Sequence, residues 1–131
     1  LSGEARYVEA AERAVRRFGP SIGESPGGYS TLLEAAHDLE HPPAVVIVAG
    51  PVGADDAGNG EAARWASALQ WSYRPWVQVY RQPPRDAPGP LVKGAPPAVG
   101  ARAWICRRMT CLPALDDLAA LEAALSRVEP G

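Results

Sequence analysis

The segment Ala44-Val45-Val46-Ile47-Val48-Ala49 decides the fold class. It is short and rich in β-branched residues, with Pro42-Pro43 before it and Gly50-Pro51 after it. A continuous apolar run of this length between chain-breaking residues is typical of a strand that is buried on both faces of a sheet. It is the longest such run and falls far short of the roughly 20 apolar residues that a membrane-spanning helix requires, so we expect no membrane span.

A helix and further strands are expected after this segment. Residues 59–73 show helical spacing of small apolar side chains that can approach a sheet closely, and residues 76–80 read as a second strand. Strand, helix and strand in this order predict a right-handed parallel unit. A third strand is expected at residues 101–106, followed by a helix over residues 115–128 with two aspartates at the positive end of its dipole.

Two helices are expected before the strand segment. Apolar positions recur at helical spacing over residues 4–18, and the pattern stops at Gly19-Pro20, because proline lacks a backbone donor and displaces the preceding residue from the helical region. A second helical pattern runs over residues 29–39 and ends before His41. Together they predict a helical hairpin.

These elements predict an α/β fold, with a small, largely parallel three-stranded sheet and flanking helices, preceded by the helical hairpin. The direction of the third strand stays open, because the proline-rich connection of residues 82–100 shows no helical periodicity. We expect the hairpin to occupy residues 1–42 as the end of an upstream helical region. A small α/β C-terminal domain is expected over residues 43–131.

Composition narrows the possible partners of this chain of 131 residues. Its 13 basic and 15 acidic residues give a net charge of −2, so no positive field attracts nucleic acid. The first residues, Leu-Ser-Gly-Glu, contain neither an initiator methionine nor a signal sequence. We therefore expect a piece of a longer, cytoplasmic protein.

The most specific local feature is the pair Cys106 and Cys111, separated by Arg-Arg-Met-Thr. The flanking Arg107 and Arg108 are candidates to stabilise a thiolate by opposite charge. A disulfide is possible if the loop folds back, and closing so short a ring is worth about 2 kcal/mol. Three interpretations stay open: the cysteines pack as small apolar residues, they form a reversible redox pair, or they bind a metal.

Metal and cofactor sites have weaker support. A zinc site would require His37 and His41 to join the cysteines, and surface histidines are the better interpretation. The segment Gly58-Asn59-Gly60-Glu61-Ala62-Ala63 matches G-x-G-x-x-A, but a loop with two carboxylates, Asp55 and Asp56, separates it from the strand. We expect neither a metal nor a cofactor.

Aromatic residues and an arginine gather between the expected helix and second strand, at Trp71, Tyr73, Arg74 and Trp76. Such rings can stack on bases or sugar faces. Packing of the rings over the edge of the sheet is the favoured interpretation at this junction.

The order of four segments resembles a known family. They are Val45-Val46-Ile47-Val48, Arg74-Pro75-Trp76-Val77, Ala103-Trp104-Ile105-Cys106 and Thr110-Cys111-Leu112-Pro113. They resemble the C-terminal region of the YyaL and spermatogenesis-associated thioredoxin-domain-containing protein family. The chain departs from it in its long proline-rich connection and in Pro113-Ala114, where a proline pair is common.

The resemblance implies a larger protein. In that family a thioredoxin-like domain precedes a helical toroid similar to six-hairpin glycosidases and epimerases, and both would be partners of this chain within one polypeptide. The chain would then be an accessory C-terminal domain without a complete active site. Two alternatives are a redox-active domain that uses Cys106 and Cys111 with an upstream thioredoxin-like motif, and the rim of a carbohydrate-processing site.

Overall fold

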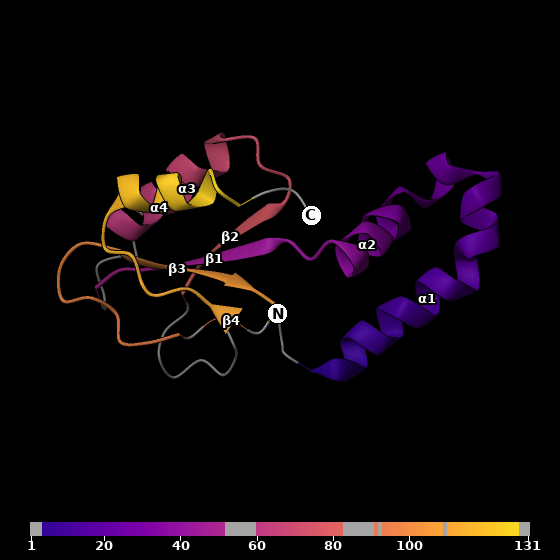
Figure 1. The fold of residues 1–131 in the computed structure, drawn as a ribbon, viewed down its shortest axis with the longest axis horizontal. Helices are drawn as coiled ribbons and strands as arrows, with labels where there is room; N and C mark the ends of the chain where they lie inside the picture. Colours follow the sequence, from indigo (N-terminus) through magenta and orange to yellow (C-terminus); the bar gives the residue numbers. More distant parts are fainter. Residues whose placement is uncertain (1–3, 52–59, 83–90, 92, 109, 129–131) are drawn as a thin grey trace. The chain divides into compact units, whose positions relative to one another are not determined.

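The computed structural model describes residues 4–51, 60–82, 91, 93–108 and 110–128 (Figure 1). These residues form two compact units, which divide between Pro42 and Pro43. No helix in the described ranges is both long enough and apolar enough to cross a membrane.

The first unit is helical. It contains α1 (Ala5–Glu24), a 3-10 turn η1 (Pro26–Tyr29) and α2 (Ser30–Glu40). The expected end of the first helix at Gly19-Pro20 is wrong, because Pro20 lies inside α1. A proline removes one backbone hydrogen bond without excluding the residues after it from helical geometry, and Ile22 then continues the apolar face.

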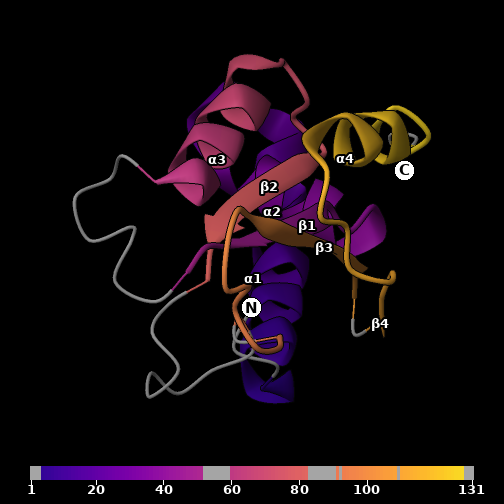
Figure 2. The same ribbon diagram turned by 90° about the vertical axis from the view of Figure 1, so that its left-hand side faces the viewer.

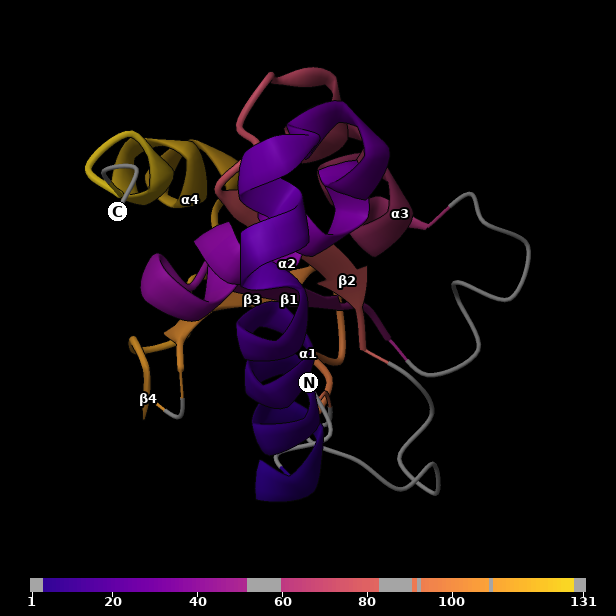
Figure 3. The same cartoon turned by 90° about the vertical axis from the view of Figure 1, so that its right-hand side faces the viewer.

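The second unit contains a four-stranded sheet with the strand order β2-β1-β3-β4. Its strands are β1 (Ala44–Ala49), β2 (Val77–Arg81), β3 (Arg102–Arg107) and β4 (Thr110–Cys111). β2 runs parallel to β1, and α3 (Glu61–Trp71) connects them, as the sequence pattern predicts. β2 forms one edge of the sheet, with α3 beside it (Figure 3).

The expectation of a largely parallel three-stranded sheet is confirmed only for β1 and β2, because the sheet is mixed and has four strands; the direction of the third strand, which the sequence left open, is antiparallel. β3 runs antiparallel to β1, and the short β4, which was not expected, runs antiparallel to β3. Ala49, at the end of β1, pairs with Arg102, at the start of β3. Because β3 thus begins at the end of the sheet where β2 finishes, the connection has no need to return along the sheet, as a parallel crossover would.

The hydrophobic core lies between one face of the sheet and two helices. α3 and α4 (Leu118–Leu125) cover the same face (Figures 1 and 2). The alternate β1 residues Ala44, Val46 and Val48 are fully buried there against Trp65, Leu69, Leu121 and Leu125, among others. Alternation of side chains across the strand then places Val45 and Ile47 on the opposite face.

The last helix is shorter than residues 115–128. Leu115 forms an antiparallel bridge with Ala103, so the chain is still extended there. α4 begins after Asp117, whose carboxylate accepts a hydrogen bond from the Ala120 amide at 2.7 Å and caps the helix.

Candidate redox site

The two cysteines lie opposite each other in the hairpin of β3 and β4. Cys106 pairs with Cys111 and Arg107 with Thr110. The Leu112 amide donates a hydrogen bond to the Ile105 carbonyl at 2.8 Å, so Cys106 and Cys111 occupy the intervening non-hydrogen-bonded pair. In such pairs the side chains approach most closely, which suits a bond between them.

The structure joins the two sulfur atoms in a disulfide with an S–S distance of 2.07 Å. The Cα atoms of Cys106 and Cys111 are 3.9 Å apart. Cys106 is only 4% exposed, whereas Cys111 is half-buried. Cys111 is therefore the more accessible residue of the pair.

The two arginines differ in their positions. Side chains alternate along a strand, so Arg107 projects from the face of the sheet opposite the sulfur of Cys106. Arg108 is exposed in the turn and has a positive φ of 53°, a conformation that favours glycine or asparagine. Stabilisation of a thiolate by these arginines stays a prediction.

The histidines lie in the other unit. The rings of His37 and His41 have centroids 5.0 Å apart, and His37 Nδ1 lies 3.7 Å from the Asp38 carboxylate. Both cysteine sulfurs are engaged in the disulfide and are not thiolate ligands in this state. The described residues contain no cluster of three or more metal-ligating side chains.

The glycine motif that resembles a dinucleotide fingerprint is only partly described. Residues 52–59, which include Asp55, Asp56 and the first glycine of the motif, lie outside the described residues. Gly60 is the residue immediately before α3, and no side chain caps this helix end.

An ion pair supports the segment that follows the hairpin. Arg102 at the start of β3 donates two hydrogen bonds to the Asp116 carboxylate, at 2.6 and 2.8 Å. These bonds, with the attraction between the charges, lower the pKa of Asp116 and raise the pKa of Arg102. The pair thus ties the chain that enters α4 to the sheet.

The aromatic cluster differs from the favoured interpretation. Trp71 and Tyr73 are each 89% exposed, so their rings do not pack over the sheet edge, whereas Trp76 is half-buried. Tyr73 and Arg74 line a groove beside β2 that the sequence does not reveal. The exposed rings make this groove a second candidate binding surface.

The fold and the hairpin define a small α/β domain with a mixed sheet and a cross-strand disulfide. Comparisons with protein-family models, curated proteins and solved structures found no match. The resemblance to a thioredoxin-domain-containing family therefore stays a prediction.

Proposed function

We propose that this chain is an accessory domain whose helical hairpin packs against the helical layer of a larger thioredoxin-domain-containing protein, and that it has no complete active site of its own. One observation carries the proposal: no residue of α1 or α2 is buried. Helices of this length gain most of their stability in water from packing. A hairpin without buried side chains therefore requires a surface to pack on.

The apolar face of α1 is the surface that would pack. Tyr7, Val8 and Phe18 are 56%, 53% and 45% exposed. At 3.6 residues per turn these three side chains lie within about a third of the helix circumference. Such a one-sided apolar face is typical of a helix that contacts another layer.

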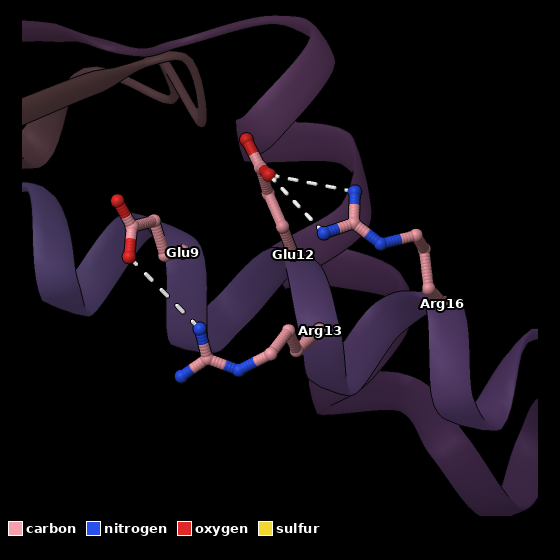
Figure 4. Close-up of polar contacts among 4 residues, drawn as sticks. All are labelled: Glu9, Glu12, Arg13 and Arg16. Atoms are coloured by element: carbon pink, nitrogen blue, oxygen red, sulfur yellow. Dashed lines mark hydrogen bonds and ion pairs between the residues drawn. The ribbon is translucent and has the colours of Figure 1, made fainter.

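The opposite face of α1 is polar. Arg13 lies 4.0 Å from Glu9, and Arg16 lies 3.4 Å from Glu12, each one helical turn apart (Figure 4). Exposed pairs of this kind add little stability but keep a face soluble. α1 thus has one face suited to solvent and one suited to a protein layer.

Photo-crosslinking in the source cells tests this proposal. A benzoylphenylalanine replaces Phe18 on the apolar face, and in a matched variant it replaces Arg13 on the polar face. Because the rings of Phe18 and Tyr29 already lie 6.2 Å apart within the hairpin, only a product with a segment outside residues 1–131 is informative. We expect the probe at position 18 to crosslink to such a helical segment of the same polypeptide, identified by mass spectrometry, and the probe at position 13 to give no such product. Equal crosslinking from both positions, or none from position 18, would refute the proposal.

The disulfide favours a second function, thiol–disulfide exchange between Cys106–Cys111 and a thioredoxin-like dithiol. A thiolate of the dithiol attacks Sγ of Cys111, and Cys106 leaves as a thiolate that takes a proton from solvent. The second thiolate of the dithiol then attacks its own partner sulfur and releases Cys111. Two electrons and two protons pass to the cysteine pair, and the dithiol becomes a disulfide.

Redox titration separates this second function from a structural disulfide. If the pair exchanges electrons, it should equilibrate with glutathione near the cytosolic poise of about −220 to −260 mV. A pair that stays oxidised below about −300 mV, or stays reduced at every cellular potential, excludes the exchange function. In addition, C106A, which leaves Cys111 free, should react with a maleimide faster than C111A, because Cys111 is the more exposed residue.

A further inference from the structure

A groove of about 240 Å³ lies beside the outer edge of the sheet, between α3 and β2. We call it the edge groove. Its apolar wall is formed by Leu69 of α3 and by Val77 and Val79 of β2, and Tyr73 and Arg74 also line it. The groove therefore combines an apolar surface, an aromatic ring and a positive charge.

The backbone of β2 adds donors and acceptors to the groove. The Trp76 carbonyl accepts a hydrogen bond from β1, and the Gln82 amide donates one to β1, so the groups of even-numbered residues face β1. Those of Val77 and Val79 consequently face outward. The Val77 amide bonds to the Arg74 carbonyl at 2.9 Å, which leaves the Val77 carbonyl and both backbone groups of Val79 directed to the outer edge.

The first four residues of this edge lack the usual protection against strand pairing, and a charge enters β2 only at Arg81. Within the described part of the chain, β2 pairs only with β1. Natural sheets block their edges with prolines, charges or bulges. The residues Val-Gln-Val-Tyr that begin β2 contain neither a proline nor a charge, so a further strand can pair here.

The charge in the groove indicates the ligand. Arg74 is half-buried, and its Nη1 atom is buried without a hydrogen-bond partner among the described residues. An unpartnered buried guanidinium nitrogen is unfavourable, and a carboxylate would satisfy it. None of the described residues that line the groove is acidic, so a carboxylate of a ligand is a suitable partner for Arg74.

The exposed rings beside the groove favour a protein ligand. Trp71 and Tyr73 are both 89% exposed. Tryptophan, tyrosine and arginine are the residue types most enriched at the energetic centres of protein interfaces. Three such residues lie within one short junction, next to an open strand edge.

We propose that the edge groove binds an extended acidic peptide segment of a partner protein by strand addition to β2. The peptide backbone bonds to the outward groups of Val79. One aliphatic side chain of the peptide packs on Leu69, Val77 and Val79, and one carboxylate binds Arg74. This surface belongs to the α/β unit, whereas the apolar face of α1 belongs to the helical unit.

Selection from a phage library of random dodecapeptides on the full chain tests the proposal. We expect enriched sequences that combine alternating aliphatic residues with an aspartate or glutamate. The amide signals of Val77 and Val79 should shift when the most enriched peptide is added, and the Val79 amide should exchange more slowly with solvent. No enrichment, sequences without an acidic residue, or shifts confined to other elements would overturn the proposal.

Two variants test the individual contacts. V79P removes the outward donor without removing a bond to β1, and we expect it to weaken peptide binding about tenfold. R74E should weaken binding at least about tenfold, while R64E, which changes the net charge equally at an exposed position outside the groove lining, should leave it unchanged. Equal binding by R74E and R64E would overturn the proposal even if V79P fails to fold.

Discussion

Replacement of Val46 by aspartate tests the placement of β1 at the centre of the core. Val46 is 0% exposed and packs among the side chains of α3 and α4. At about pH 7 the V46D chain loses the least folding free energy when the buried carboxyl of the new aspartate is protonated. Holding a group with an ordinary pKa of about 3.9 neutral there costs about 4 kcal/mol, at about 1.4 kcal/mol per pH unit. Loss of the buried valine adds about 2 kcal/mol, so the total of about 6 kcal/mol exceeds the lower end of the usual stability range of about 5–15 kcal/mol.

The pH dependence of this variant is the sharper result. Burial raises the carboxyl pKa in the folded state, so the folded chain binds a proton that the unfolded chain has lost, and stability falls as pH rises above about 3.9. Between about pH 7 and about pH 4.5 the V46D chain should regain about 3 kcal/mol relative to the parent. Asparagine has a shape similar to aspartate and does not titrate, so the loss of unfolding free energy of V46N relative to the parent should not change with pH.

Urea unfolding followed by tryptophan fluorescence measures both variants. Trp65 is buried in the same core as Val46, so its emission should report loss of that core. If V46D and V46N show the same pH dependence, or if V46D unfolds close to the parent, β1 does not occupy the buried position described above.

Three further predictions concern the β3–β4 hairpin and the segment that leads from it into α4. Arg102 lowers the pKa of Asp116, so the pair stabilises the fold above about pH 4, and this stabilisation is lost as pH falls through the lowered pKa. The stability of D116N in acid unfolding should therefore lack this loss, whereas the control E122Q should show the same loss as the parent. D117A should cost about 1 kcal/mol in urea unfolding by removing the helix cap, and D117S should restore most of it. R108G should stabilise the chain by up to about 1 kcal/mol, because glycine adopts the positive φ at this turn without a steric penalty; a destabilised R108G would contradict the turn geometry.

The sequence predicts those elements that depend on local patterns. The bounds of β1 are correct because proline and glycine punctuate an apolar run, and the parallel pairing with β2 follows from the intervening helix. The continuation of α1 beyond Pro20 could not be predicted from the positions of glycine and proline alone, because the loss of one backbone hydrogen bond does not end an exposed helix. The start of the last helix was misplaced because Leu115 continues the apolar spacing of α4 while pairing with Ala103 as a strand.

The disulfide was partly visible in the sequence. Cys106 and Cys111 have the spacing of a hairpin with a two-residue turn, in which the cysteines occupy opposite positions. What the sequence lacked was evidence that the chain reverses there, because β4 has only two residues and shows no periodicity. A non-glycine residue with positive φ, Arg108, stands where a glycine or asparagine would have signalled the turn.

The edge groove could not be predicted from the sequence for a different reason. The cluster of Trp71, Tyr73 and Arg74 is plain in the sequence, but whether such rings pack or remain exposed depends on what lies beyond β2. That depends on strand order, which is set by β3 pairing on the far side of β1 from β2. The position of β3 thereby leaves β2 as an edge and exposes the junction between α3 and β2. The exposure of that surface thus follows from the strand order, which no local pattern encodes, and the strand order has to be known before the exposed aromatic residues can be interpreted.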